Sequence, residues 1–442
     1  MRQVAPWGRA MFGLMALGIA LCALTALGPL ALRTYGDNAF CALALVSGGL
    51  TAWATARATE GDGRWTLPLI LVLGLLMRLI VLPVEPLLSD DIYRYVWDGR
   101  VQAVGINPYR YVPADPALTV LRDPAIFPRI NRADYAVTIY PPVAQVFFVL
   151  VTRVSESVLA LKLALLGCEV VIVAVVIDLL RRLGRPIGRV VAYVWHPLPI
   201  WEVANNGHVD ALMVALMMGG IWLAVAYGRV LWGAAVITLG ALAKPFALLA
   251  LPPLWRPFDW RMPLIVAAVA GLAYAPYLSV GTGVFGFLGS GYLAEERIDT
   301  GGGFWLLSVW RTLFGLSPHD ASVYLALSLL ALAAFALQAG FRRERTPAST
   351  LAGINRLLLV FLFLLSPDYP WYFLMAVPFL ALLGGAPGWV LTVGGFMLYD
   401  VVTGDPQIPF FVRDAAFNGL FLAATVFTQL RQRFSAIAEV RT

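Results

Sequence analysis

The segment MFGLMALGIALCALTALGPLAL, residues 11–32, decides the fold class of this chain. It holds 22 consecutive residues without a charged side chain, and roughly 20 apolar residues let a helix cross the hydrocarbon core of a bilayer. Inside that core every backbone amide must find its partner within the protein, so such a segment is helical. Similar segments recur along the 442 residues, which are 60% hydrophobic and 13% charged, with a mean hydropathy of +0.78. We therefore expect an all-α, polytopic transmembrane helical bundle.

About twelve apolar segments are candidate membrane spans, and two more are interpreted differently. The segment 139–152 has only 14 residues and opens with Tyr140-Pro141-Pro142, which favours a short interfacial helix. The segment 230–254 is interrupted by Lys244-Pro245, which predicts two half-length helices in a re-entrant hairpin. The candidate spans are residues 11–32, 38–56, 66–84, 159–180, 190–203, 209–227, 262–280, 320–340, 352–366, 370–385, 388–403 and 413–430.

The arginines predict the orientation of these spans, because short cytoplasmic loops are enriched in Lys and Arg. Arg2 and Arg9 place the N-terminus on the cytoplasmic side. If the segments 139–152 and 230–254 do not cross the membrane, the basic turn at 181–189 also falls on that side. Both termini are then cytoplasmic. The net charge of +6 is explained by these clusters at span ends, and no basic stripe with interleaved aromatics indicates nucleic-acid binding. We expect one integral membrane domain, 1–442, with a first large exterior loop and its interfacial helices at 85–158.

The strongest candidate site is LLSDDIYRYVWDGRVQAVGINPYRY, residues 87–111. In a helix Asp91, Arg94 and Asp98 share roughly one face. A carboxylate near an apolar surface has its pKa raised toward the range of a general base, which makes Asp90 and Asp91 candidate catalytic groups. Arg94 and Arg100 are candidates to bind a phosphate. The alternative is an ordinary amphipathic helix lying on the membrane.

Three other polar elements are candidate substrate-binding segments. The turn at 205–210 brings polar groups to a span boundary, where ionisable residues are costly and often functional. Lys244, one of two lysines in the chain, lies among apolar residues and needs an anionic partner, for which a lipid phosphate is expected; the alternative is a lysine that snorkels or pairs with a carboxylate. Trp371 and Tyr372 in SPDYPWY offer an aromatic rim for a sugar or lipid, or else belong to the interfacial aromatic belt. The polar residues of the turn are Asn205, Asn206, His208 and Asp210.

The order of these motifs resembles the GT-C superfamily of polytopic glycosyltransferases. A membrane exit, an acidic pair, GINPYRY, an interfacial YPP segment, an RRLGRP turn, a GHxD-like turn and a KP-interrupted hairpin follow one another. Within that superfamily the chain is most similar to polyprenyl-phosphate-mannose-dependent mannosyltransferases and to the first mannosyltransferase of GPI-anchor assembly. The likeness covers roughly residues 66–255 and reappears at 366–373.

The resemblance implies that the catalytic carboxylate is Asp90 or Asp91. Eukaryotic relatives carry Asp-x-Asp here; its second Asp matches Asp91, and its first falls on Ser89, where this chain departs from the pattern. The implied ligands of the substrates also include Asp98 and Tyr140.

The resemblance further implies an inverting glycosyltransferase of the cell (inner) membrane whose active site faces the exterior. A polyprenyl-phosphate-linked sugar, with mannose favoured, would be the donor, and a glycan or glycolipid the acceptor. The departing phosphate would be stabilised by Arg, Lys or a divalent metal such as Mg²⁺ or Mn²⁺, so the metal requirement is open. The alternative function is a transporter or flippase of lipid-linked sugars, which would also use intramembrane charge and broken helices.

Overall fold

The computed structural model describes residues 6–60, 64–365, 368–400 and 408–441. Arg2 and the Ser366-Pro367 pair, both used in the sequence interpretation, lie outside these residues. The described chain forms helices and no strands, and it divides into two compact units. The first unit contains residues 1–80, 180–200 and 368–442, and the second contains 81–179 and 201–367.

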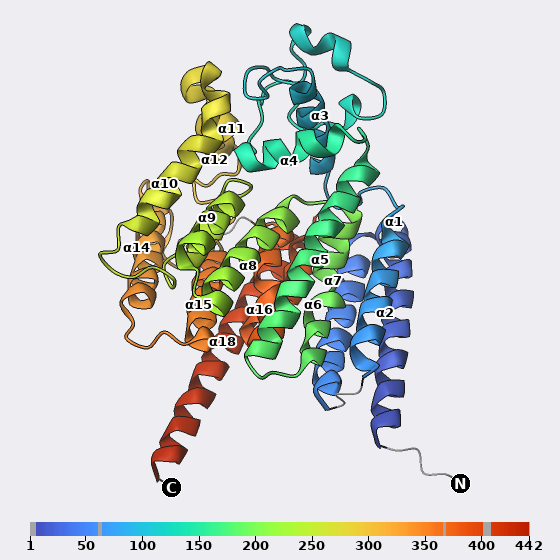
Figure 1. The fold of residues 1–442 in the computed structure, drawn as a ribbon, viewed down its shortest axis with the longest axis vertical. Coiled ribbons are helices and arrows are strands. Elements are labelled where there is room, and N and C mark those ends of the chain that lie inside the picture. Colours follow the sequence, from blue (N-terminus) through green and yellow to red (C-terminus); the bar gives the residue numbers. More distant parts are fainter. Residues whose placement is uncertain (1–5, 61–63, 366–367, 401–407, 442) are drawn as a thin grey trace. The chain divides into compact units, whose positions relative to one another are not determined.

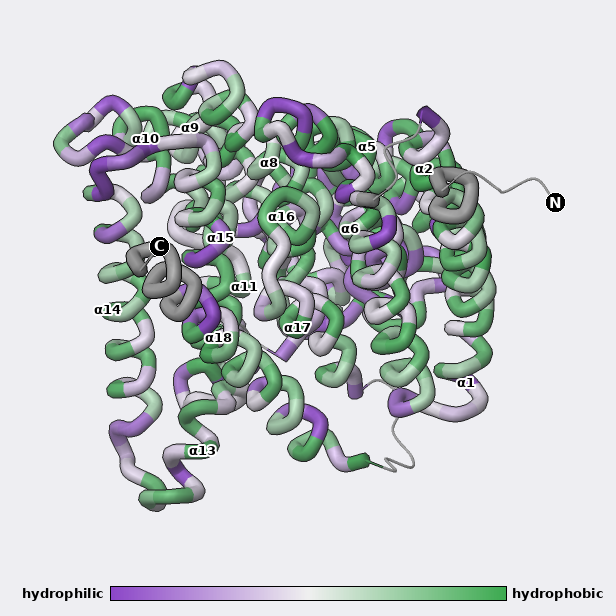
Figure 2. Tube along the Cα trace, turned by 90° about the horizontal axis from the view of Figure 1, so that it is seen from below, coloured by the Kyte–Doolittle hydropathy of each residue, from purple (hydrophilic) through white to green (hydrophobic). Residues whose placement is uncertain are grey.

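Seven helical segments of the described residues are long and apolar enough to cross a membrane. They are Met11–Thr59, Val158–Arg182, Asp210–Tyr227, Arg261–Glu295, Asp320–Phe341, Pro347–Leu364 and Phe410–Gln432. Shorter apolar helices occur at Thr66–Val81, Pro142–Thr152, Val230–Ala241, Pro370–Leu382 and Ala386–Leu398. Figure 2 shows hydrophobic residues along most of the length of α1 and α14. The predicted all-α, multi-pass membrane fold is confirmed.

The first unit is built on two long terminal helices and several short ones. Its helix α1 (Pro6–Glu60) contains two segments joined at Gly36, whose φ of 78° breaks the helical geometry between the two predicted spans. The remaining elements are α2 (Thr66–Val81), η3 (Ile187–Val190), α6 (Val191–Val194), α7 (Pro197–Pro199), η7 (Pro370–Ala376), α16 (Val377–Leu382), α17 (Ala386–Gly394), η8 (Gly395–Leu398) and α18 (Phe410–Arg441).

Residues 190–203 do not form the single helix expected of a span. The chain is broken at His196, which is extended (ψ 131°) and whose ring accepts a hydrogen bond from the amide of Leu198. Pro197 and Pro199 cannot donate backbone hydrogen bonds, which explains why a continuous helix fails here. The buried break is stabilised by neighbours in the same unit, since Arg78 donates to the carbonyl of Val194 at 2.7 Å.

The second unit begins with a polar segment and continues into packed helices. Its elements are α3 (Asp91–Ala103), η1 (Pro116–Leu121), η2 (Phe127–Arg129), α4 (Pro142–Thr152), α5 (Val158–Arg182), a π-helical turn η4 (Ile200–Asn205), α8 (Asp210–Tyr227), α9 (Val230–Ala241), η5 (Pro245–Ala250), α10 (Arg261–Tyr274), η6 (Ala275–Phe285), α11 (Gly286–Ser290), α12 (Tyr292–Glu295), α13 (Trp305–Phe314), α14 (Asp320–Phe341) and α15 (Pro347–Leu364). Figure 1 shows α3 and α4 at one end of α5, α8 and α9.

The structure shows a short helix at 139–152 and an interruption at Lys244-Pro245, as predicted, although a six-residue 3₁₀ turn stands where the second half-length helix was expected; the interfacial and re-entrant placements stay predictions. Helix α4 is short and has Pro142 in its first turn, as expected for 139–152. The 230–254 segment is interrupted at Lys244, whose extended backbone separates α9 from the 3₁₀ turn η5. Helices α8 and α9 approach so closely that a Cβ on Gly220 would lie 2.5 Å from the carbonyl oxygen of Gly233. Small residues permit such contacts between membrane helices.

Candidate functional site

Asp90 and Asp91 lie where the chain enters α3. Asp91 is the first residue of the helix, and its amide donates to the hydroxyl of Ser89 at 3.2 Å. The Asp91 carboxylate accepts a hydrogen bond from the Asn131 amide at 2.7 Å, and its side chain is 19% exposed. Asp90 makes no capping hydrogen bond. Partial burial and the charge of Asp91 raise the pKa of Asp90, and the charge of Arg129 opposes that rise.

A histidine lies between Asp91 and a second acidic side chain. The Nδ1 atom of His208 lies 3.9 Å from Oδ2 of Asp91, and its Nε2 atom lies 3.2 Å from Oε2 of Glu202. His208 and Glu202 are almost fully buried, so the partly exposed Asp91 is the member of the group that a substrate can reach. Burial lowers the pKa of His208 to about 3, so its imidazole is neutral at physiological pH. The 3.9 Å separation is longer than a hydrogen bond, so His208 lies beside Asp91 without donating to it.

The backbone that carries His208 requires a glycine. Gly207 has a φ of 69°, in the left-handed region that L side chains rarely adopt. A Cβ on this residue would lie 2.3 Å from Cδ1 of Ile92, on the first turn of α3. The close approach brings the 206–209 turn against α3, and this is how residues about 115 positions apart in sequence form one cluster.

Asn205 and Asn206 hold the segment that precedes α3. The Asn206 side chain accepts hydrogen bonds from the amides of Leu87 and Leu88 at 3.1 and 3.0 Å. The Asn205 amide donates to the carbonyls of Val81, Val84 and Glu85 at 3.2–3.3 Å. Asn206 also donates to Glu202 at 3.2 Å. These two predicted substrate-binding residues are therefore occupied in positioning the segment that carries Asp91.

Lys244 and Asp210 form a buried ion pair. The ammonium lies 2.6 Å from Oδ2 of Asp210, the first residue of α8. Lys244 therefore has the anionic partner that its position required, and that partner is a carboxylate of the protein.

Two predicted residues of α3, Arg94 and Asp98, form a polar network with Gln145 of α4. Arg94 pairs with Asp98 at 2.8 Å and donates to the carbonyl of Ala136 at 3.1 Å. The amide of Gln145 donates to Asp98 at 3.1 Å. This network fixes α3 against α4 and the 136–138 segment, and its groups are buried.

Tyr140 and Arg100 are also engaged in packing. The ring of Tyr140 packs edge-on against Tyr95 at 4.9 Å between centroids. Arg100 forms ion pairs with Asp123 and Glu156. The predicted roles of Arg94 and Arg100 as phosphate ligands stay predictions. Both arginines already pair with carboxylates of the protein, which makes them less available to a phosphate.

Trp371 and Tyr372 belong to the first unit, whereas all the other predicted site residues lie in the second. Within its own unit Trp371 stacks on Tyr369 at 4.5 Å between ring centroids, and Tyr372 is buried. The aromatic rim they were expected to form stays a prediction.

Two residues that complete the cluster were not selected as site residues from the sequence. Glu202 carried a usable signal, because a carboxylate within an apolar segment is costly unless it has a role. Asn131 carried none, since it is one polar residue among many in a long loop. Among the described residues, no group of three or more His, Cys, Asp or Glu side chains is arranged to hold a metal ion.

Comparison with known proteins gives two matches. The family model described as alpha-(1->6)-mannopyranosyltransferase, N-terminal domain, matches residues 13–256, which include α3 and the His208 turn. Alpha-(1->6)-mannopyranosyltransferase A of Mycobacterium tuberculosis is 24% identical over 350 residues, covering 73% of this chain. The alignment spans 66% of that relative's length, slightly less than two thirds. No solved structure matches the chain.

Proposed function

Because the chain belongs to the alpha-(1->6)-mannopyranosyltransferase family, we propose that it is an inverting glycosyltransferase that transfers a sugar, with mannose favoured. The donor is a polyprenyl-phosphate-linked sugar, and the acceptor is a glycan or a lipid-linked glycan. The observation that carries this proposal is the arrangement of Asp91, His208 and Glu202, in which one reachable carboxylate accepts a hydrogen bond from Asn131 and lies beside a buried histidine and glutamate. The name of the M. tuberculosis relative supports mannose and an α-(1→6) linkage.

Asp91 is the general base of the proposed reaction. Its carboxylate takes the proton of the acceptor hydroxyl as the acceptor oxygen forms a bond to the anomeric carbon. The bond from that carbon to the phosphate oxygen breaks on the opposite side, and its electron pair leaves with the polyprenyl phosphate. Attack opposite to the leaving group inverts the anomeric configuration. A positioned base of this kind contributes roughly 10²–10⁴-fold to the rate.

The neighbours of Asp91 position the base. Asn131 donates to one carboxylate oxygen, which directs the other, Oδ2, toward His208 and the open side of the cluster. The two asparagines of the turn hold the preceding segment by its backbone. A rigidly held base acts in a geometry close to that of the transition state, which lowers the entropic cost of the reaction.

The proposed location of the reaction is the exterior face of the cell (inner) membrane, with both termini cytoplasmic. The distribution of arginines supports this orientation. The departing phosphate is stabilised by arginine, lysine or a divalent metal such as Mg²⁺ or Mn²⁺.

The test is transfer by purified full-length protein in detergent from a radiolabelled polyprenyl-phosphate mannose to a mannan or mannolipid acceptor. We expect a product with the anomeric configuration opposite to that of the donor, and loss of that product in Asp91→Asn. A transporter or flippase would instead give no product with any sugar donor while moving labelled lipid across proteoliposomes. That result would overturn the proposal.

A further inference from the structure

Helices α11 and α12 dock on the segment that carries Asn131, the hydrogen-bond partner of the proposed base. The amide of Phe287 in α11 donates to the carbonyl of Thr138 at 3.1 Å. Gly286 permits this approach, since a Cβ on it would lie 1.9 Å from the same carbonyl oxygen and its φ is 56°. Figure 1 shows both helices at the same end of the second unit as α3 and α4. The reaction proposed above gives this contact no role.

Arg132 joins this segment to α12. Its Nε atom pairs with Glu295, the last residue of α12, and its Nη2 atom lies 2.9 Å from Oε1 of the next residue, Glu296. The guanidinium also lies 5.7 Å from the centre of the Tyr292 ring, on the first turn of α12. A guanidinium can serve two carboxylates at once because its donors are fixed in one plane. The side chains of Arg132 and Glu296 are 21% and 8% exposed, so solvent screens these ion pairs less than pairs on an open surface.

The backbone of Arg132 has a conformation that its surroundings must hold. Its φ is 55°, in the left-handed region, where residues other than glycine are uncommon. The described residues contain three such positions, and another of them, Arg297, directly follows Glu296. A left-handed arginine persists only where neighbouring contacts over-determine it. The ion pairs of Arg132 are contacts of this kind, and they fix the backbone beside Asn131.

Asn131 connects Arg132 to the base. It is the residue before Arg132, and its side-chain amide donates to the Asp91 carboxylate at 2.7 Å. The carbonyl of Arg132 accepts a hydrogen bond from the amide of Ala136 at 3.1 Å, which closes a turn directly after Asn131. Burial opposes the charge of Arg132, but its contacts with the two glutamates and the charge of Asp91 raise its pKa. Arg132 is therefore coupled to the base both through its neighbour and through charge.

The same segment is held at its other end by α3 and α4. Arg94 of α3 donates to the carbonyl of Ala136 at 3.1 Å, and Gln145 of α4 donates to the hydroxyl of Thr138 at 2.7 Å. These contacts fix residues 136–138, whereas the ion pairs with α12 act at the residue next to Asn131. The position of Asn131 relative to Asp91 therefore depends most directly on Arg132.

We propose that Arg132 is a positioning residue, whose ion pairs with Glu295 and Glu296 hold Asn131 where it orients Asp91. The inference rests on the proposed function, because it assigns a role in the same reaction. Helix α12 lies beyond residues 13–256, the part of the chain that the family model matches. A part of the chain outside that match therefore controls the geometry of the base.

Amide hydrogen exchange of residues 128–138, in the full-length protein in detergent, tests the contact without reference to transfer. Arg132→Asn removes the guanidinium and introduces a residue type that tolerates a left-handed backbone, so the turn itself is not strained further. We expect faster exchange of this segment in Arg132→Asn, since a loop that loses its contacts opens more often. The double variant Glu295→Gln/Glu296→Gln should show the same change and replaces Arg132→Asn if that variant does not fold. Unchanged exchange would overturn the proposal.

Single-turnover transfer from radiolabelled polyprenyl-phosphate mannose tests the positioning role. At saturating protein the rate constant reports the geometry of the site and does not depend on the fraction of protein that is folded. We expect this constant to fall at least about tenfold in Arg132→Asn, because misplacing a catalytic group by about 1 Å can cost about 10²-fold. The protein concentration that gives half the maximal rate should change less than about twofold, since neither substrate loses a contact.

The possible results separate this inference from the proposed function. A wild-type rate constant in Arg132→Asn would overturn the positioning role and leave the transferase intact. A rate constant that is unchanged while half-saturation shifts would overturn it as well, because Arg132 would then bind substrate. Absence of transfer by the wild-type protein would overturn the proposed function, and this inference with it.

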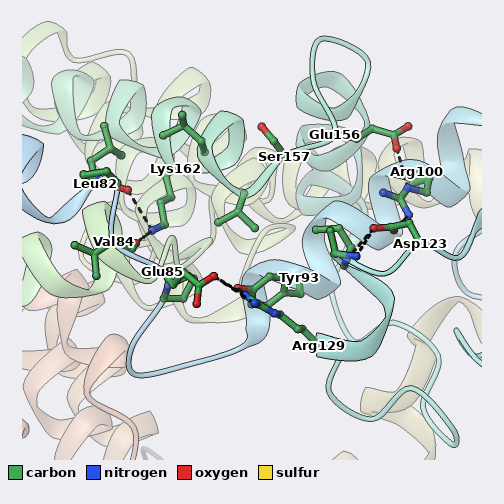
Figure 3. Close-up of a pocket in the computed structure, with 16 residues that line it drawn as sticks. Leu82, Val84, Glu85, Tyr93, Arg100, Asp123, Arg129, Glu156, Ser157 and Lys162 are labelled. Atoms are coloured by element: carbon green, nitrogen blue, oxygen red, sulfur yellow. Dashed lines mark hydrogen bonds and ion pairs between the residues drawn. The ribbon is translucent and has the colours of Figure 1, made fainter. Parts of the chain in front are cut away.

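A double-mutant cycle locates the effect in the ion pairs. Adding Glu295→Gln and Glu296→Gln to Arg132→Asn should slow transfer no further, because all three substitutions remove the same contact. The matched control is Arg129→Gln. Arg129 belongs to the same loop but pairs with Glu85 and Tyr93, as Figure 3 shows, and in the described part of the chain it forms no hydrogen bond or ion pair with α12. Its effect should therefore multiply with that of the two glutamate substitutions. Multiplication in the Arg132 cycle would overturn the assignment.

Discussion

Replacing Asp91 with asparagine removes the proposed base and alters little else. The side chains are nearly isosteric, and an asparagine oxygen can still accept the 2.7 Å hydrogen bond from Asn131, so the start of α3 should keep its geometry. Loss of a general base costs roughly 10²–10⁴-fold in rate. At about 1.36 kcal/mol for each factor of ten, the barrier rises by about 2.7–5.4 kcal/mol.

The measurement is single-turnover transfer of radiolabelled mannose from a polyprenyl-phosphate donor, with unfolding midpoints recorded in parallel. The matched control is Asp134→Asn, which removes one exposed carboxylate from the same polar loop and should leave the rate unchanged. Asp90→Asn should cost less than about tenfold, because the Asp90 side chain is not fixed by a capping hydrogen bond at the start of α3. The reasoning is refuted if Asp91→Asn keeps more than a tenth of the wild-type rate, or if Asp90→Asn loses as much as Asp91→Asn.

Three further outcomes are expected, and a fourth experiment separates two alternatives. Lys244→Met leaves the buried Asp210 carboxylate without its partner at 2.6 Å and should lower the free energy of unfolding by about 3–5 kcal/mol, measured as a lower unfolding midpoint. Adding Asp210→Asn should recover part of this loss. A double variant as unstable as Lys244→Met alone would contradict the ion pair. Asp90→Asn should raise the unfolding midpoint at pH 7: an aspartate whose folded pKa is raised binds its proton more tightly when folded, so the wild type loses stability as pH rises through the folded pKa. The difference between the two proteins should shrink as the pH is lowered, and a lower midpoint for the variant at pH 7 would count against the raised pKa. Gly207→Ala places a Cβ 2.3 Å from the Ile92 side chain at a φ of 69° and should cost at least about 1–2 kcal/mol together with transfer activity, whereas an unaltered midpoint would show that the turn relaxes freely. Dialysis against EDTA, followed by addition of Mg²⁺ or Mn²⁺, separates the two ways of stabilising the departing phosphate: loss and recovery of transfer would assign that role to a divalent cation, and unchanged transfer would assign it to arginine or lysine.

Much of the fold could be predicted because lipid imposes strict rules on sequence. Apolar length alone indicated the spans, and Pro142 and Lys244-Pro245 indicated the short helix and the interrupted segment. Residues 190–203 could not be predicted in this way, because apolar content does not distinguish a helix from a buried broken segment. That break depends on tertiary hydrogen bonds, such as the one from Arg78 to Val194.

The sequence predicted which residues belong to the candidate site better than it predicted which of them contact one another. The acidic pair and the His208 turn were recognised from residue types that are costly near a membrane. Their contacts across more than a hundred residues were not predictable, because each polar group had several chemically equivalent partners. Lys162 shows the limit clearly: it is as rare in the sequence as Lys244, yet its hydrogen bonds to the carbonyls of Leu82 and Val84 could not be predicted from that rarity.

The attachment of residues 81–88 to Asn205 and Asn206 has a consequence for the biogenesis of the protein. The segment before α3 finds its hydrogen-bond partners about 118 residues later in the chain. A ribosome must therefore deliver all of α4, α5 and the broken 190–205 segment before the entry to α3 can reach its final geometry. Truncated or incompletely inserted chains would carry both aspartates without the support that makes one of them a base, so assembly itself delays the appearance of a competent site.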